Sequence, residues 1–209
     1  MRTKKDQTTN VTPNTQTKML TQLNTIKSRL AITITDYDTL LANAIKAVSA
    51  RFDSECNRVF ARATDATEEF GAEEIELRPA LYPIENVSKF ELKTDETGGW
   101  MEQTGVEYLI RHACVLSLAA PLGNFREQAR VTYSGGYVLP GDTPAAGQTS
   151  LPGDLEQAAV EQVAYWYRNR DKLGLLRSWP HQGTYETFAQ LDLLIEVKAV
   201  LRKHERWSV

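Results

Sequence analysis

The sequence predicts an α+β protein, in which helices from the N- and C-terminal ends form a helical bundle and a small antiparallel β-sheet domain is inserted between them. Two observations carry this prediction. Near both ends of the chain, apolar residues recur at intervals of three and four, which is typical of amphipathic helices. Between the ends, short runs of alternating apolar residues are separated by glycine, proline and charged residues, which is typical of short strands joined by turns.

The composition sets outer limits on what the protein can be. The chain has 209 residues, of which 42% are hydrophobic, so it can bury a substantial core and is not disordered throughout. Its 27 acidic residues outnumber the 24 basic ones, giving a formal net charge of -3. A protein that coats nucleic acid by charge alone needs a basic excess, so any contact with DNA should be local or indirect. The sequence shows neither a membrane span nor a signal peptide.

The N-terminal part is expected to supply a tail and two helices. Residues 1–16 hold almost no large apolar side chains and are expected to form a flexible tail. Residues 17–65 should form the N-terminal helices of the helical body. The first of these is indicated by the helical spacing of Leu20, Leu23, Ile26 and Leu30. The second should run from about Asp36 to Arg62, with Thr35 as its N-cap and Asp36 and Asp38 in its first turn.

Residues 66–138 are expected to form the antiparallel β insert. The predicted strands are near Glu74–Arg78, Val87–Lys93, Glu107–Ile110, Cys114–Leu118 and Arg130–Tyr133. No helical pattern separates them, so they should pair antiparallel rather than in βαβ units. Residues 139–151 are expected to be a loop rich in glycine and proline.

Residues 152–209 should form the C-terminal helices and tail of the helical body. One helix should begin just after the Pro152-Gly153-Asp154 boundary and stop before Gly174. A last helix should begin at about Thr187.

The sequence gives no catalytic, cofactor-binding or metal site, so the protein is expected not to be an enzyme and to need no cofactor. The three histidines, at positions 112, 181 and 204, lack a recognised metal-ligand spacing. Cys56 and Cys114 lie in apolar segments and are expected to be free thiols of the core. A run of acidic residues is interpreted as a solvated face: Asp65, Glu68, Glu69, Glu73, Glu74 and Glu76.

The most unusual feature is a cluster of aromatic and arginine residues between positions 165 and 179. Successive helical residues point about 100° apart, so Tyr165, Trp166 and Tyr167 cannot all enter one core, and at least one should face a neighbouring domain or subunit. Tryptophan, tyrosine and arginine are enriched at interface hot spots. With the basic C-terminal segment, the candidate assembly residues are Tyr165, Trp166, Tyr167, Arg170, Arg177, Trp179, Arg202, Lys203, Arg206 and Trp207.

Two stretches of the sequence resemble the head–tail connector proteins, or adaptors, of tailed bacteriophages and gene-transfer agents. In that family a strand ending in a Gly-Tyr turn precedes a Pro-rich loop and a helix with an aromatic pair. The matching positions are Gly136, Tyr137, Pro152, Leu155, Ala158, Trp166, Tyr167, Asn169 and Arg170. The N-terminal helices also look like those of the family. Its Leu-Arg-Ile signature is altered here to Leu30, Ala31, Ile32, with the arginine one place earlier at Arg29.

The resemblance implies a structural virion protein of the neck, between head and tail, that is assembled in the host cytoplasm. Such a protein forms a ring, commonly of twelve subunits, under the portal after DNA packaging. The implied partners are the portal protein, a neck (stopper) or tail protein, other copies of the chain, and double-stranded DNA that passes through the lumen without sequence-specific binding. No membrane is involved.

A closed ring needs two different complementary patches on each subunit. We hypothesise that the acidic run and the basic C-terminal helix form such a pair, with Arg202 and Lys203 on the basic side. The alternative function is a nucleic-acid-binding accessory factor in DNA packaging, which would use the same basic helix. A metal-dependent hydrolase built on the acidic run is the weaker rival.

Overall fold

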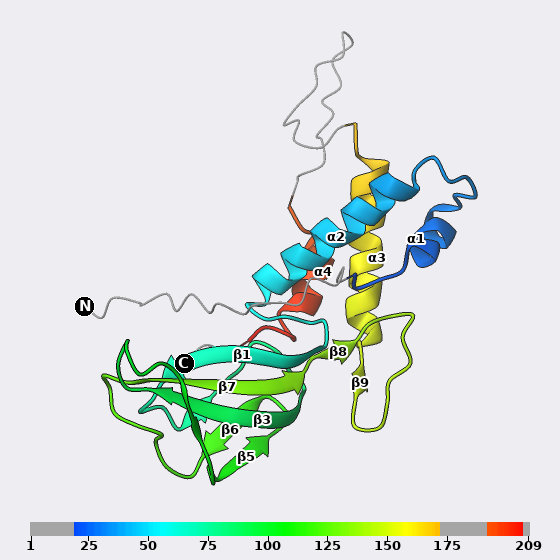
Figure 1. The fold of residues 1–209 in the computed structure, drawn as a ribbon. Helices are drawn as coiled ribbons and strands as arrows, with labels where there is room; N and C mark the ends of the chain where they lie inside the picture. The colour runs from blue at the N-terminus through cyan, green and yellow to red at the C-terminus, as the bar shows by residue number, and fades with distance from the viewer. Residues whose placement is uncertain (1–18, 172–191, 207–209) are drawn as a thin grey trace.

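The structure, a computed structural model, describes residues 19–171 and 192–206. Its mixed α and β composition is compatible with the predicted α+β class (Figure 1). The helices are α1 (Leu23–Leu30), α2 (Asp38–Glu55), α3 (Gly153–Arg168) and α4 (Ile195–Leu201). The strands are β1 (Ala63–Gly71), β2 (Glu76–Leu77), β3 (Ile84–Lys93), β4 (Met101–Gln103), β5 (Tyr108–Arg111), β6 (Val115–Leu118), β7 (Gln128–Gly135), β8 (Tyr137–Val138) and β9 (Thr149–Ser150). The expected tail, 1–16, and the expected start of the last helix at Thr187 lie outside the described residues.

A residue in the left-handed conformation ends both α1 and α2: α1 ends at Leu30, as the sequence predicts, whereas α2 ends at Glu55, before the predicted Arg62. Ala31 (φ 56°) follows α1, and the Ile32 amide donates to the Lys27 carbonyl at 3.0 Å. Asn57 (φ 49°) follows α2, and the Arg58 amide donates to the Asp53 carbonyl at 3.1 Å. These are Schellman-type ends, which satisfy the last carbonyl groups of a helix and turn the chain away from its axis.

The starts of these helices also correct two predictions. The chain before α1 is not helical, and Leu20 is buried there while its amide donates to Ser49 Oγ of α2 at 3.0 Å. Thr35 is not the N-cap of α2, which begins at Asp38 without a side-chain cap. Asp38 does stand in the first turn as expected, and it forms an ion pair of 2.7 Å with Lys27 of α1.

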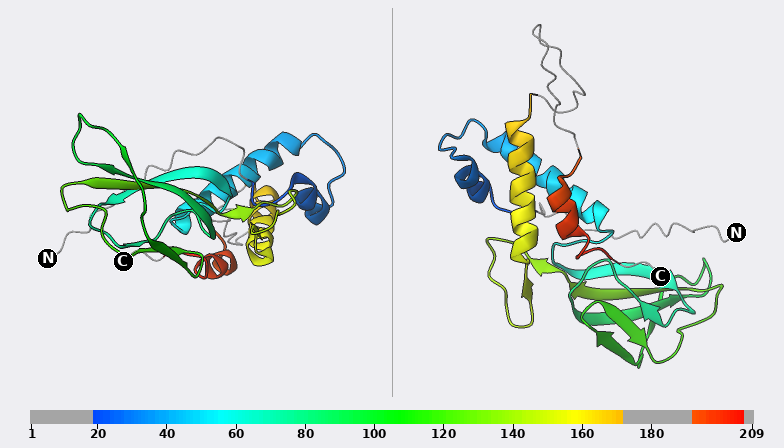
Figure 2. Two further views of the ribbon diagram at one scale, coloured as in Figure 1. Left: turned by 60° about the horizontal axis from the view of Figure 1, so that its bottom comes forward. Right: turned by 180° about the vertical axis from the view of Figure 1, so that it is seen from behind.

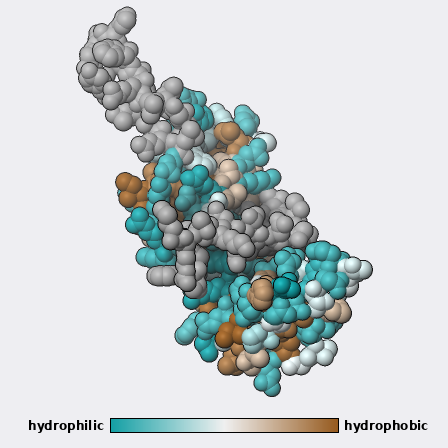
Figure 3. Space-filling model, turned by 90° about the vertical axis from the view of Figure 1, so that its left-hand side faces the viewer, coloured by the Kyte–Doolittle hydropathy of each residue, from teal (hydrophilic) through white to brown (hydrophobic). Residues whose placement is uncertain are grey.

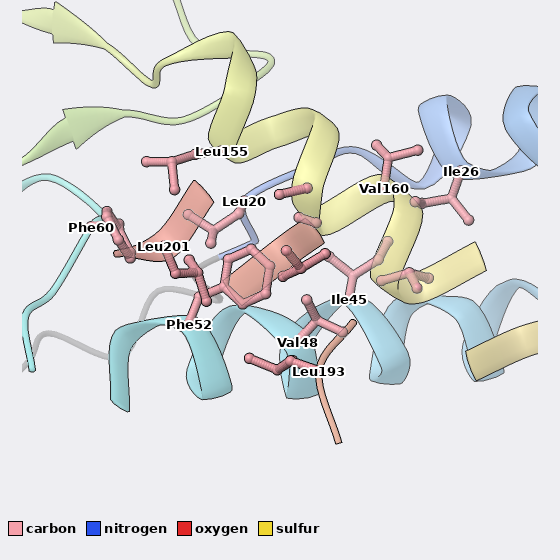
Figure 4. Close-up of a cluster of buried hydrophobic side chains, with 14 of the residues drawn as sticks. Leu20, Ile26, Ile45, Val48, Phe52, Phe60, Leu155, Val160, Leu193 and Leu201 are labelled. Carbon is pink, nitrogen blue, oxygen red and sulfur yellow. The ribbon is translucent and has the colours of Figure 1, made fainter. Parts of the chain in front are cut away.

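All four helices contribute to one buried hydrophobic cluster (Figure 4). Phe52 and Ile45 of α2 face Leu155 and Val160 of α3, while Leu201 of α4 closes the cluster. Segments from the two ends of the sequence therefore share one core, since Leu20 and Leu201 are members of the same cluster. Within the described residues, no helix is both long enough and apolar enough to span a membrane.

The residues between α2 and α3 form two antiparallel sheets, as the sequence predicts, and one short parallel pair of strands. The larger sheet has the strand order β1-β7-β3-β4 and the smaller one β2-β6-β5. The two sheets bury a common cluster, in which Leu116 of β6 lies with Phe90 of β3 and Val131 of β7. Figures 1 and 2 show the sheets at one end of the molecule and the helices at the other.

Four strands, β1, β4, β8 and β9, were not expected from the sequence. Strand β1 covers nine residues and pairs along β7, although its sequence, ATDATEEFG, is rich in acidic residues. Strand β4 is three residues long and pairs with β3. The loop predicted for residues 139–151 contains β9, which pairs parallel with β8 and guides the chain back towards α3.

Candidate assembly surface

The described part of the aromatic cluster includes Tyr165, Trp166 and Tyr167 in the last turns of α3, next to the start of α2. Tyr165, Trp166 and Tyr167 are each half-buried. Trp166 and Tyr167 pack against the helical core, and Tyr165 is the one of the three that lies outside that cluster, as far as the described residues extend. The Tyr165 side chain is therefore the best candidate of the three to face another subunit.

Arg170 and two tyrosines form a stack at this end of the helices. The ring of Tyr167 meets the ring of Tyr37 edge-on, with 5.6 Å between the centroids. The Arg170 guanidinium lies 4.7 Å from the centroid of Tyr167 and 5.8 Å from that of Tyr37. Arg170 is exposed, so these cation–π contacts leave one side of its guanidinium accessible to a partner.

The three basic candidates that follow α4 have different surroundings. Arg202 and Lys203 are exposed. Arg206 is held within the chain, because its guanidinium donates to the Glu68 carboxylate at 3.0 Å and their side chains are only 16% and 8% exposed. The remaining candidates, Arg177, Trp179 and Trp207, lie outside the described residues.

Glu68 corrects the interpretation of the acidic run as a wholly solvated face. Its carboxylate also accepts hydrogen bonds from the Tyr133 hydroxyl at 2.9 Å and from the Ala80 amide at 2.8 Å. The pKa of Tyr133 is raised, mainly because burial disfavours the phenolate and because the Glu68 charge adds to that effect. The basic and acidic segments thus already meet within one chain at Arg206 and Glu68, and only Arg202 and Lys203 are exposed to meet a second subunit.

The segment from His204 to Arg206, which we call the strap, joins the helical and β parts. The Arg206 amide donates to the Cys56 carbonyl at 2.8 Å, and the Tyr82 hydroxyl donates to the His204 carbonyl at 3.1 Å. The His204 ring lies 3.2 Å from Asp154 at the start of α3. The strap therefore ties the end of α2, the chain before β3 and the start of α3 to one point.

Arg58 is the residue at this junction that sequence reasoning missed. It is 3% exposed, and its guanidinium donates to the Tyr82 and His204 carbonyls. The guanidinium also covers the Tyr82 ring at 3.2 Å from the centroid and lies 5.3 Å from that of Tyr137. Burial lowers the pKa of Arg58, although its interactions with the Tyr82 and Tyr137 side chains oppose this effect. An arginine just after a helix gives no signal in the sequence that it is buried.

The residues considered for chemistry form no reactive site in the described part of the chain. Cys56 and Cys114 are free thiols, the former buried and the latter half-buried. Burial raises the pKa of Cys56 to about 12, so its thiol is not a nucleophile near neutral pH. Among residues 19–171 and 192–206, no three histidine, cysteine, aspartate or glutamate side chains are grouped so as to hold a metal ion.

Comparison with known proteins gives matches at the level of structure. The sequence matches no protein-family model, and no curated protein is significantly similar to it. The fold is similar to a chain in the neck of an empty GTA particle computed with C6 symmetry, with a TM-score of 0.61. It is also similar to a chain in the virion of the native gene transfer agent particle (TM-score 0.60) and to one in the neck of the native particle computed with C12 symmetry (TM-score 0.54). Each match has 14% sequence identity and covers 97% of both chains, so the likeness extends over the helical and β parts together.

Proposed function

We propose that this protein is a structural virion protein, a head–tail connector or adaptor, built as a helical bundle with an inserted β domain. It assembles as a ring under the portal, extends the DNA channel and provides the docking surface for the neck or tail. Its partners are the portal protein, a stopper or tail protein, and further copies of itself, twelve in the virion. The ring is assembled in the host cytoplasm and surrounds double-stranded DNA without sequence-specific contacts.

The observation that carries this proposal is the end-to-end likeness of fold to chains of GTA particles, at 97% coverage of both chains. A match confined to the helices or to the sheets would be weak support, because small parts of this kind occur in many folds. Here the match covers the helices and the sheets together. The sequence motifs around Tyr137 and between Pro152 and Arg170 support the same family independently of the fold.

The charge distribution favours this proposal over the nucleic-acid-binding accessory factor. Residues 63–138 hold 13 acidic and 6 basic residues, so the β part carries a formal charge of -7. Phosphate groups are repelled by such a surface, and the exposed Arg202 and Lys203 are too few to overcome it. A ring of such subunits can surround DNA without holding it.

The test is a mass measurement combined with electron microscopy of the purified chain, alone and mixed with a candidate portal protein. We expect ring-shaped density on one face of the portal and a complex of defined mass. The double variant Arg202→Glu/Lys203→Glu should weaken ring formation or portal docking, whereas Arg51→Glu on the outer side of α2 should not. A chain that never binds the portal, and instead binds DNA as a monomer in a salt-dependent way, would establish the accessory factor instead.

A further inference from the structure

Strand β5 is a sheet edge with exposed apolar side chains. Among the described strands it pairs only with β6, so its other side is open. All four of its residues are exposed, and Leu109 is 65% exposed. In Figures 1 and 2 the strand lies at the end of the molecule away from the helices, and Figure 3 shows hydrophobic patches among hydrophilic ones over the β part.

The exposed apolar residues of the described chain are concentrated in this part of the molecule. Six of the nine large hydrophobic side chains that are exposed belong to residues 63–138, namely Ile75, Met101, Tyr108, Leu109, Ile110 and Phe125. Protein sheet edges are usually protected by charged residues or by very short strands. Strand β1 carries Asp65 and Glu69 in this way, whereas three successive residues of β5 are apolar.

The backbone of β5 has free hydrogen-bonding groups on its open side. The Ala119 amide donates to the Glu107 carbonyl at 2.9 Å, so the odd-numbered residues direct their backbone groups towards β6. The N–H and C=O groups of Tyr108 and Ile110 consequently point away from the sheet. An extended peptide laid along β5 would pair with these groups, as in recognition by strand addition.

The charge of the β part selects what kind of peptide fits there. With 13 acidic residues against 6 basic ones, residues 63–138 attract a basic segment, and Glu107 stands directly before β5. The 18 residues before the described part of the chain hold four basic residues and one acidic residue. They include the run TTNVT at 8–12, whose β-branched residues favour an extended strand, followed by Pro13, which stops pairing.

We propose that β5 binds residues 8–12 of a second copy of this chain as an added strand, with Lys4 and Lys5 against the acidic β part. A second copy is favoured over the same chain because Leu20 is fixed in the helical core, whereas β5 lies at the far end of the β part. Only seven residues separate Thr12 from Leu20, so a short link joins this segment to the helical core. The inference deepens the proposed function, since it names a contact between neighbouring subunits of the ring.

The test is a titration of the full-length chain with a fluorescent synthetic peptide of residues 2–17, followed by anisotropy. We expect saturable binding that weakens as salt is added, because lysine–carboxylate attraction is screened. Ile110→Pro removes an outward N–H and should weaken binding about tenfold or more, and the variant should still fold because an edge strand accepts proline at such a position. The matched Ile110→Thr keeps that N–H and should retain binding. A peptide with proline at both Asn10 and Val11 should also fail to bind, and this arm does not depend on how the protein variants fold.

Absence of peptide binding, or equal binding by the proline and threonine variants and by both peptides, would overturn strand addition at β5. The peptide assay needs neither portal nor ring, so its failure leaves the connector proposal standing and is distinguishable from the failure of that proposal.

A cross-linking experiment identifies the donor of the strand. Chains carrying Val11→Cys and chains carrying Leu109→Cys are mixed under oxidation. Both carry Cys114→Ser to remove the half-buried native thiol, and Cys56 is kept because its thiol is buried. We expect covalent dimers from this mixture and few from the matched control with Thr97→Cys, which is exposed in the turn between β3 and β4. No mixed dimers, together with an internal disulfide when both cysteines are in one chain, would show that the segment binds its own β5 and would overturn the second-copy arrangement.

Discussion

The carboxylate of Glu68 joins three segments that are distant in the sequence. It accepts hydrogen bonds from Ala80, Tyr133 and Arg206, and its side chain is 8% exposed. A buried charge is tolerated when it is paired and hydrogen-bonded, and its partners become costly to remove. The Arg206–Glu68 ion pair therefore fixes the strap to β1 mainly because separating it would leave a buried charge without a partner, and less because of its net attraction.

Replacing Arg206 by methionine should lower the free energy of unfolding by about 3 kcal/mol, because it leaves the Glu68 carboxylate buried without its cation. The control Arg202→Met, at an exposed position, should change it by less than about 0.5 kcal/mol. Adding Glu68→Gln to Arg206→Met should restore part of the loss. Urea unfolding of the four proteins measures these values, and equal midpoints for the two single arginine variants would contradict the buried pair.

Glu91 should make stability depend on pH. Arg130 donates two hydrogen bonds to its carboxylate, at 2.7 and 2.9 Å, and these bonds lower the pKa of Glu91 below its ordinary value of 4.5. A carboxyl group whose pKa is lower in the folded state binds protons more readily when unfolded. The stability that the Glu91 carboxylate contributes is therefore present above pH 4.5 and is lost as the pH falls through the pKa of Glu91 in the folded state.

Thermal unfolding of Glu91→Gln and the wild type from pH 7 to pH 3 should show this dependence. We expect the variant to have the lower melting temperature at pH 7, with the difference shrinking in acid because the wild-type carboxylate becomes protonated. Glu96→Gln, in the exposed turn after β3, is the control. A difference that stays constant over the range would rule out the lowered pKa as its cause.

At the scale of single residues, the sequence could predict residue types but not their surroundings. The aromatic run 165–167 was recognisable because its three rings diverge around a helix. Arg206 and Arg202 look alike in the sequence, yet one is buried against Glu68 and the other is exposed. That difference depends on where β1 lies relative to the strap, which is a long-range contact that no local pattern encodes.

Helix α1 ends at a position where alanine is strained. Ala31 has a φ of 56° and a ψ of 38°, in the left-handed region, which costs a residue with a Cβ about 1 kcal/mol relative to glycine. Ala31→Gly should therefore raise the free energy of unfolding by roughly that amount. The same change at Ala50, exposed in the interior of α2, should lower it by about 1 kcal/mol.

Chemical denaturation of these two glycine variants measures the sign of each change in the free energy of unfolding. Opposite signs are expected, because glycine relieves strain at the helix end and adds chain entropy in the helix interior. Destabilisation by both substitutions would show that the end of α1 does not impose the left-handed conformation.

At the scale of elements, helices with a clear apolar period were predictable and their ends were not. The predicted second helix ran on to Arg62 because Val59 and Phe60 continue the apolar spacing, but Asn57 ends the helix at Glu55. Strand β1 was missed because its acidic residues are poor strand formers. Its period of two is visible once the strand is known, since Ala66 and Glu68 are buried on one face.

The whole molecule is held together at Arg58, which lies between the helical and β parts. Replacing it with methionine keeps much of the volume but removes the donors to the Tyr82 and His204 carbonyls. We expect a loss of about 2–3 kcal/mol, since buried acceptors would be left unsatisfied. The control Arg51→Met changes an arginine whose side chain is 51% exposed and should be nearly neutral.

Limited proteolysis distinguishes this junction from an ordinary core position. Arg58→Met should be cut faster near residues 57–62 while the fragments remain structured, because the contact between the parts is weakened first. Uniform loss of all structure, with no early cut at the junction, would show that Arg58 stabilises one part rather than the connection.

The general arrangement was predictable because periods of three to four and of two occupy separate stretches of the chain. The relative placement of the parts was not, since it is set by contacts such as Arg58 with Tyr82 and Arg206 with Glu68, whose partners are 24 and 138 positions apart. The pairing of β8 with β9 across a Pro-rich loop is a further contact of this kind.

The strap also bears on the order in which the protein can fold during synthesis. Strands β1 to β7 have all their pairing partners once residue 135 has been made. The helical core needs Leu201, and the junction needs His204 and Arg206, all of which are made more than 60 residues after β7. Domains tend to fold as units while the chain emerges, so the sheets can form early and the helical half must wait for Leu201. A nascent chain therefore has no complete helical surface to offer a neighbour until residues 201–206 have been made, well after the sheets.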